Sequence, residues 1–449
     1  MTLTDHKKRG QWSSSIGFVL AALGSAVGLG NIWRFSYVVG ENGGGAFILV
    51  YLIAVIGLGL PLLIAELAIG QRARANSVDA FQRISSGRPW RWAGWLGVAA
   101  SLAILSYYPV VAGWVTRYLW TYSIEGIDGS GPGFTAYFDA VIADPFQALL
   151  WLGAVLLVAA SIVAAGVERG IELASRVLMP LFAILVVLLA GYGLSLPGAS
   201  QALTFLFAPD WGALLEPKTY LVAIGQAFFS IGLAMGILVT YGSYLAKAER
   251  LPRAALVIAA GDTLIALVAG VMIFPAVFTY GLDPAHGPTL AFVVLPEVFA
   301  AMPAGRWIAT AFFLLLFVAA LTSVIALLEV PVSLMMARWG WPRSAAAIAA
   351  AAVGFAIGIP SALGYGILRD AFLRSAPPLD LIDHFASNVL LPLSGIAIAL
   401  FVGWGWPAAD ALQSSGLVGR RLRWMWIWLL RVVIPGIIAL VMLRGLGLL

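Results

Sequence analysis

Long apolar stretches separated by short polar segments recur along the whole chain. A helix needs about 20 mostly apolar residues to cross the hydrocarbon core of a membrane. The stretches that meet this length lie at roughly 13–38, 44–70, 90–122, 147–166, 171–196, 219–246, 254–281, 305–338, 342–360, 380–403 and 424–446. Their number predicts an all-α integral membrane protein with 11 transmembrane helices.

Composition strengthens this interpretation. Of the 449 residues, 61% are hydrophobic and 10% are charged. A soluble protein of this length cannot bury so much apolar surface, so lipid must be the solvent for much of the chain. The sequence contains no cysteine, which excludes disulfides and thiolate chemistry.

The charged residues are distributed unevenly between the connecting segments. Basic residues gather before the first span, between the second and third, after the sixth, between the eighth and ninth, and before the eleventh. The segment 122–146, on the opposite side if the spans alternate, has acidic residues and no lysine or arginine. The positive-inside rule therefore predicts a multi-pass protein of the inner (plasma) membrane, with its N-terminus in the cytoplasm and its C-terminus outside. This pattern indicates a lipid bilayer, and no nucleic acid, as the partner of the net charge of +5.

Glycines and polar residues interrupt two of the spans. The first span contains "LGSAVGLGNIWRF" from Leu23 to Phe35, and the sixth contains "FFSIGLAMG" from Phe228 to Gly236. Close packing of neighbouring helices would explain any one of these glycines. The two interruptions correspond, however, if one transporter domain (1–446) consists of two five-helix repeats, approximately 13–196 and 219–403, and an extra helix, approximately 424–446. Paired broken helices of this kind indicate a transport site at the membrane midplane.

Unwound backbone at this depth needs a partner that lipid does not provide. Free carbonyl groups suit a hard cation such as sodium. The N-terminal end of a half-helix suits a carboxylate, through its amides and its partial positive charge. A zwitterion bound together with cations would satisfy both sets of groups.

Four stretches carry a resemblance to a known family. The stretches "GSAVGLGNIWRF", "ENGGGAF", "GQAFFSIG" and "ALTSVIALLEV" resemble the neurotransmitter:sodium symporters, in particular the eleven-helix bacterial amino-acid transporters of the LeuT type. The similarity runs from Trp12 to the eleventh span. It implies a 5+5 inverted repeat plus one extra helix, with helices 1 and 6 unwound at the midplane, and sodium-coupled symport by alternating access.

The resemblance implies two sodium sites. The first would use the substrate carboxylate with Ala26, Asn31, Ser230 and Asp262, and the second would use Gly24, Val27, Ala319, Thr322 and Ser323. Ala319 and Ser323 are four residues apart and share a helix face, with Thr322 adjacent. Five or six oxygen ligands suit a hard cation. Local hydrogen bonds to the helix backbone are the alternative explanation for the Thr-Ser pair.

The resemblance also implies a substrate pocket. Tyr108 would donate to the substrate carboxylate, beside the amides near Leu29 and Gly30. The other lining residues would be Ala26, Gly28, Ile104, Phe229, Ser230, Gly232, Met235, Ser323 and Leu327. Relatives that carry amines have an aspartate at the position of Gly28, so we expect a substrate with its own carboxylate, a hydrophobic L-amino acid. Gly232 is expected to leave room for its side chain.

Charged residues inside the spans need a stated role because their burial is costly. By the resemblance, Arg34 and Asp383 would form an outer gate with Phe229 as a lid, although a static ion pair is the alternative. Arg9, Trp12 and Tyr244 match an inner gate, whose expected acidic partner is replaced by Ala337. Glu66 and Glu329 are expected to bond backbone amides freed by the helix breaks.

Asp262 stands where chloride-dependent relatives carry a neutral residue, and Ala266, one turn later, has no group to bind an anion. Two opposite charges 4 Å apart attract by about 4 kcal/mol at an effective dielectric constant near 20. A carboxylate can therefore take the place of chloride beside sodium. We expect a chloride-independent carrier.

Three other functions remain as alternatives. A channel would show rings of polar groups in an oligomeric pore, whereas here the polar residues are scattered over helices 1, 3, 6, 7 and 8. An intramembrane enzyme is not expected, because the sequence has neither HExxH nor GxSxG. A receptor that binds an amino acid with sodium and does not transport it would share the fold.

Overall fold

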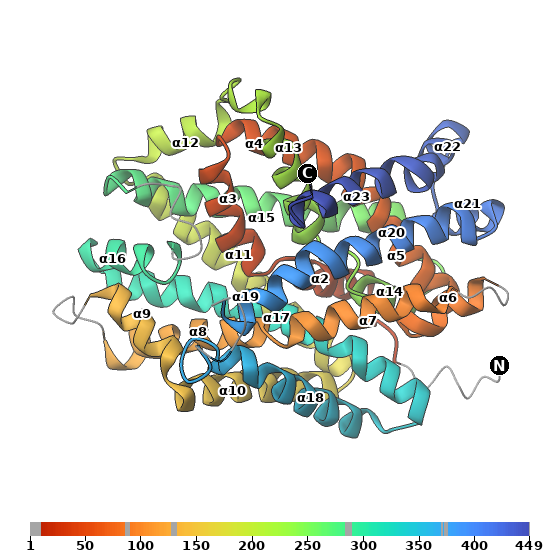
Figure 1. The fold of residues 1–449 in the computed structure, drawn as a ribbon, viewed down its shortest axis with the longest axis horizontal. Coiled ribbons are helices and arrows are strands. Elements are labelled where there is room, and N and C mark those ends of the chain that lie inside the picture. The colour runs from red at the N-terminus through yellow and green to blue at the C-terminus, as the bar shows by residue number, and fades with distance from the viewer. Residues whose placement is uncertain are drawn as a thin grey trace.

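The computed structural model of the protein describes residues 10–85, 90–126, 133–282, 290–369, 371 and 376–448. Over these residues the regular structure is helical (Figure 1). Nine helical runs in this part of the chain are long and apolar enough to cross a membrane. They are Gly45–Ala73 (α4, η2, α5), Arg91–Glu125 (α7, α8, η3), Pro145–Ala164 (α10), Val167–Leu194 (η4, α11), Leu251–Thr279 (α15), Gly305–Trp339 (α17), Arg343–Leu363 (α18), Pro378–Gly405 (α19, η7, α20, η8) and Arg420–Gly445 (α22, η9, α23).

The two remaining predicted spans are interrupted. The first consists of α2 (Ser15–Ala26) followed by η1 and α3 (Gly30–Glu41), with a bend of 56° between them. The sixth consists of α13 (Pro217–Ser230) and α14 (Ile237–Ser243), each too short to cross a membrane alone. Shorter helices lie between the spans: α6 (Ser77–Ile84), α9 (Phe134–Ala143), α12 (Ala199–Phe207), α16 (Val294–Ala301) and α21 (Ala408–Ser414).

Figure 1 shows the half-helices α2 and α14 near the middle of the molecule, beside the long helix α17. Most of the apolar stretch of α17 is buried inside the protein, in contrast to α10 and α18, which pack on each other at one edge. The interrupted helices are therefore surrounded by protein and not by lipid. This is the condition under which non-helical backbone is tolerated at membrane depth.

The first break follows from the sequence after Ala26. Val27 adopts an extended conformation, and the Gly28 amide donates to Oδ1 of Asn31 at 3.2 Å. The Asn31 side chain thus replaces the carbonyl that a continuous helix would have supplied to this amide. The helix resumes at Gly30 as a π-helical turn.

The second break has three residues with positive φ, which are Gly232, Ala234 and Gly236. Alanine is strained in this conformation, and two buried side chains hold Ala234 in it. Oε1 of Glu66 on α5 accepts from the Ala234 amide at 2.7 Å, and Oγ of Ser394 on α20 donates to its carbonyl at 2.7 Å. The expectation that Glu66 bonds an amide freed by a helix break is confirmed.

The inner half-helix α14 packs very closely against α5. A methyl group at Gly70 would lie 2.2 Å from the carbonyl oxygen of Val239, and one at Gly242 would lie 2.9 Å from that of Leu67. Both contacts are with backbone, which has little freedom to move away. This approach fixes the position of α14 below the second break.

We expect Gly70→Ala to lower the thermal unfolding midpoint of the detergent-solubilised protein, because the added methyl group forces α5 and α14 apart. Overpacking of this kind costs about 1–3 kcal/mol. Gly57→Ala is the matched control on the same span, since a methyl group there meets nothing within 4 Å. Equal midpoints for the two variants would show that the close approach of α5 and α14 is not required.

Candidate functional site

A cavity of about 40 Å³ lies where the two breaks meet. Its lining comes from α2 and η1, α7 and α8, the break between α13 and α14, and α17. The residues are Ser25, Ala26, Gly28, Gly30, Asn31, Ile104, Tyr108, Phe229, Ser230, Gly232, Met235, Ile237, Ser323 and Leu327. Every residue predicted for the substrate pocket is among them except Leu29, which faces a second cavity. Ser25 and Ile237 were not predicted, although each is a direct neighbour of a residue in a predicted break.

The cavity lining includes the polar side chains of Asn31, Tyr108, Ser230 and Ser323. The Leu29 amide donates to the hydroxyl oxygen of Tyr108 at 3.0 Å. This hydroxyl group therefore keeps its own hydrogen for an acceptor. Tyr108 is the first residue of α8, directly after the interruption that separates it from the end of α7 at Leu105. A carboxylate is the acceptor that such a group of donors suits best.

Three predicted sodium-binding side chains meet in one buried cluster. Nδ2 of Asn31 donates to Oδ1 of Asp262 at 2.7 Å and to Oγ of Ser230 at 2.9 Å. The Ser230 hydroxyl donates to Oδ2 of Asp262 at 2.7 Å, and the Tyr51 hydroxyl donates to Ser230 at 3.3 Å. Asp262 takes part in none of the ion pairs formed by the described residues. A buried carboxylate without a counter-ion is costly, so a cation beside these oxygens would stabilise the cluster.

The residues predicted for the second sodium site lie on facing helices. A methyl group at Gly24 of α2 would lie 3.3 Å from Cβ of Thr322 on α17. The Thr322 hydroxyl donates to the Ala319 carbonyl at 3.0 Å, and the Ser323 hydroxyl donates to the same carbonyl at 3.2 Å. These bonds to the backbone of α17 are the ones expected if the Thr-Ser pair has only a local structural role. Each hydroxyl oxygen still has lone pairs to offer a cation, because it uses only its hydrogen in these bonds.

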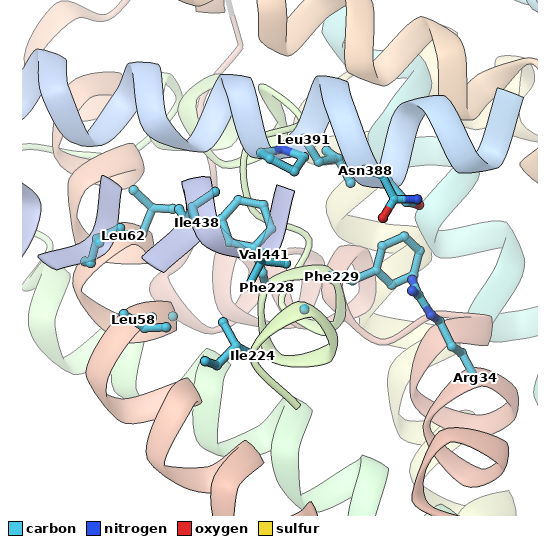
Figure 2. Close-up of a pocket in the computed structure, with 15 residues that line it drawn as sticks. Arg34, Leu58, Leu62, Ile224, Phe228, Phe229, Asn388, Leu391, Ile438 and Val441 are labelled. Carbon is cyan, nitrogen blue, oxygen red and sulfur yellow. The ribbon is translucent and has the colours of Figure 1, made fainter. Parts of the chain in front are cut away.

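The predicted outer gate lines a larger cavity of about 390 Å³. Arg34, Asp383 and Phe229 all border it, and Phe229 also borders the cavity at the breaks. The predicted ion pair of Arg34 and Asp383 is not among those of the described residues. The Arg34 guanidinium lies over the Phe229 ring instead, 4.4 Å from its centre, as Figure 2 shows.

Two hydrogen bonds attach Trp12, a residue predicted for the inner gate, to the end of α14. The Trp12 amide donates to the Tyr244 carbonyl at 3.3 Å, and its indole Nε1 donates to the Tyr241 carbonyl at 3.0 Å. Arg9 lies outside the described residues. Trp12 and Tyr244 are therefore brought together as expected.

Tyr244, which is also predicted for the inner gate, bonds to a buried ion pair. The Tyr244 hydroxyl donates to Oε1 of Glu329 at 2.5 Å, and the other oxygen of Glu329 pairs with Arg343. Glu329 lies two turns before Ala337 on α17. The expectation that Glu329 bonds a freed backbone amide is wrong, because the described contacts of its carboxylate are with these two side chains.

Glu172 is a contributor to this end that was not predicted. Its carboxylate accepts from the amide and the hydroxyl of Ser13, both at 2.7 Å, and from Arg176 at 2.7 Å. These bonds tie the residues before α2 to the beginning of α11. The spacing of Glu172 and Arg176 indicates a helical ion pair, but nothing in it identifies Ser13 as a partner.

Arg343→Ala should destabilise the protein by about 3–5 kcal/mol, because it leaves the Glu329 carboxylate buried without its cation. The free energy of unfolding measured by denaturant titration in mixed micelles would show the loss. Arg338→Ala is the control, since Arg338 lies in the last turn of α17, close in sequence to Arg343, and is exposed. An Arg343→Ala variant as stable as Arg338→Ala would mean that Glu329 is compensated in another way.

Comparison with known proteins decides the family. The model of the sodium:neurotransmitter symporter family matches residues 9–126 and 141–447. The chain belongs to this family. An uncharacterised sodium-dependent transporter of Bacillus subtilis, YhdH, is 38% identical to this symporter chain over 98% of both sequences, and one of Haemophilus influenzae is 34% identical over 99% of both.

A solved structure supports the same fold. The crystal structure of MhsT in complex with L-phenylalanine is 48% identical in sequence and matches this symporter with a TM-score of 0.90, over 97% of this chain and 100% of that chain. The predicted fold class, an all-helical LeuT-type membrane protein, is confirmed. The family comprises sodium-dependent transporters and not enzymes, and this symporter is a multi-pass membrane protein.

Proposed function

We propose that this symporter carries hydrophobic L-amino acids together with sodium by alternating access across the inner membrane, with its N-terminus in the cytoplasm and its C-terminus outside. The observation that carries the proposal is the cavity at the two breaks, whose lining combines polar side chains such as Tyr108 and Ser323 with apolar ones such as Ile104 and Leu327. The similarity to MhsT, solved with L-phenylalanine, supports this substrate class.

Gly28 in the cavity supports an amino acid over an amine, and a second glycine, Gly232, has a different explanation. A methyl group at Gly28 would lie 2.7 Å from the Tyr108 hydroxyl and 2.9 Å from Oγ of Ser323, so a longer side chain that could hold an amine does not fit there. At Gly232 a methyl group would lie 3.7 Å from its nearest neighbour. Its φ of +71° is the stronger reason for glycine. Backbone conformation thus favours glycine at position 232, and room for the substrate side chain stays a prediction.

The coupling ions are proposed to occupy two sites beside this cavity. Asn31, Ser230 and Asp262 would hold one sodium ion with the Ala26 carbonyl and the substrate carboxylate. The carbonyls of Gly24, Val27 and Ala319 with the hydroxyls of Thr322 and Ser323 would hold the other. Two inward charges gain about 4.6 kcal/mol per 100 mV, which is enough for roughly a thousandfold substrate gradient.

The two interrupted helices would be related to each other by the proposed inverted repeats. Residues of approximately 13–196 and 219–403 would form the two inverted halves, each contributing one interrupted helix, and the helix of approximately 424–446 would pack outside them. Alternating access would then move the interrupted helices against α17 and its neighbours.

We expect proteoliposomes containing the protein to accumulate tritiated L-phenylalanine or L-leucine when an inward sodium gradient is imposed, and to accumulate neither when potassium replaces sodium. Thr322→Val should raise the sodium concentration for half-maximal uptake about tenfold or more, because one oxygen ligand of a cation is lost. Thr310→Val, on the same helix, also loses a hydroxyl bonded to its own helix backbone and should leave uptake unchanged.

Three results would contradict parts of this proposal. Binding of the amino acid with sodium but without uptake would favour a receptor, and unitary currents in planar bilayers would favour a channel. An equal effect of Thr322→Val and Thr310→Val would remove Thr322 from the sodium site.

Chloride independence is proposed from the surroundings of Asp262. Its carboxylate lies in the cluster with Ser230 and Tyr51, and Ala266, one turn later on α15, is buried. The fixed negative charge would take the place that an anion needs beside sodium.

Uptake by the unmodified protein should be unchanged when gluconate replaces chloride. The double substitution Asp262→Asn and Ala266→Ser should lose uptake in gluconate and keep it in chloride, because it removes the fixed charge and adds a hydroxyl donor for an anion. Ala266→Ser alone keeps the carboxylate and should remain independent of chloride. A collapse of uptake by the unmodified protein in gluconate would refute this part of the proposal.

A further inference from the structure

An open groove of about 490 Å³ lies between the beginning of α2 and the beginning of α15, away from the cavity at the breaks. One wall is formed by α2, and the other by α15 and the residues that precede it. The lining includes Ser15 and Ile16 of α2, and Glu249, Arg250, Arg253 and Val257 on the other wall. Neither the proposed transport cycle nor the gates use these residues.

The groove combines apolar walls with two arginines. Ile16 is 71% exposed and Val257 is 46% exposed, so each helix presents apolar surface to the groove. Arg250 and Arg253 are exposed, and neither takes part in an ion pair of the described residues. Glu249, the acid of the groove, accepts from the Ser15 hydroxyl at 2.9 Å. The groove therefore has a net charge of +1 from two arginines and one glutamate.

The two arginines lie on the side of the protein where basic residues gather. Arg250 and Arg253 belong to the segment after the sixth span, which the charge distribution places in the cytoplasm. Basic pockets between membrane helices on this side suit anionic lipid headgroups. We propose that the groove binds an anionic phospholipid of the cytoplasmic leaflet, with its phosphate at Arg250 and Arg253 and an acyl chain along Ile16 and Val257.

Charge and shape distinguish this lipid from other occupants. The segment 1–9 contains Lys7, Lys8 and Arg9 against one acid, Asp5, so its charge has the same sign as that of the groove. Free phosphate would satisfy the arginines and leave the apolar walls in water. A lipid with a neutral headgroup would cover the walls without compensating the arginines.

A lipid in this position would touch α2 and α15 at the same time. The bond between Ser15 and Glu249 already joins the beginning of α2 to the residues before α15. A lipid beside this bond would hold the first turns of α2 in place and slow their opening. The effect on transport rests on the proposed function, whereas binding of the lipid does not.

Native mass spectrometry of the full chain in mixed phosphatidylglycerol and phosphatidylcholine should show preferential retention of phosphatidylglycerol. Arg250→Gln with Arg253→Gln should lower the ratio of the two retained lipids about 25-fold, since each arginine that pairs with the lipid phosphate in the groove contributes about fivefold. Arg420→Gln with Arg421→Gln is the matched control, because it removes two exposed arginines at the beginning of α22. The control should keep the preference.

A second pair of variants tests the apolar wall. Val257→Trp should fill the groove and lower retention of phosphatidylglycerol, whereas Leu256→Trp, at an exposed neighbour that does not line the groove, should not. Hydrogen exchange of residues 15–26 in nanodiscs should be slower with phosphatidylglycerol than with phosphatidylcholine for the unmodified protein. This difference should vanish in Arg250→Gln with Arg253→Gln.

Three outcomes would overturn the proposal. They are retention of both lipids in proportion to their abundance, an equal loss in the groove variants and their controls, and displacement of the lipid by millimolar inorganic phosphate. If uptake of amino acids fails while lipid retention follows the expected pattern, the proposed function is wrong and the lipid site stands.

Discussion

The structure depends on one constraint, which is that every peptide group within the membrane needs a hydrogen-bond partner inside the protein. Helical backbone meets this constraint within its own segment, and it makes up most of the nine spanning runs of the described chain. The two interrupted spans do not meet it in this way, and the protein must supply partners for the groups they release. The positions of these partners decide where a cavity forms and which ligand it suits.

Side chains from within the breaks and from distant helices satisfy several of the released groups. Asn31 takes the amide of Gly28 within the first break, and Glu66 and Ser394 hold Ala234 in the second. Tyr108 takes the Leu29 amide and keeps its own hydrogen for another acceptor. The breaks are thus rigid where they contact protein and open where they face the cavity. Such preorganisation reduces the entropy that a ligand loses on binding.

Much of this could be predicted because the relevant signals are local. Span positions follow from apolar length, and the breaks follow from glycines and polar residues such as Gly28 and Asn31 within apolar runs. Ser394 could not be predicted as a partner of Ala234, because α20 lies 160 residues away and a serine in a membrane helix usually bonds its own backbone. The contact of Glu172 with Ser13 is equally non-local. The separation of Arg34 from Asp383 depends on the conformation of the molecule, which the sequence does not specify.

The inner end of the molecule is held by two kinds of contact that differ in how easily they open. Residues before α2 are attached through hydrogen bonds of Trp12 and Ser13, which water can replace when α2 moves. The buried pair of Glu329 and Arg343 joins α17 to α18 and does not involve α2. Opening at α2 therefore leaves the buried carboxylate paired, and the large penalty of an uncompensated charge does not arise. A carrier that must open and close repeatedly needs this separation between replaceable hydrogen bonds at the moving helix and a permanent ion pair behind it.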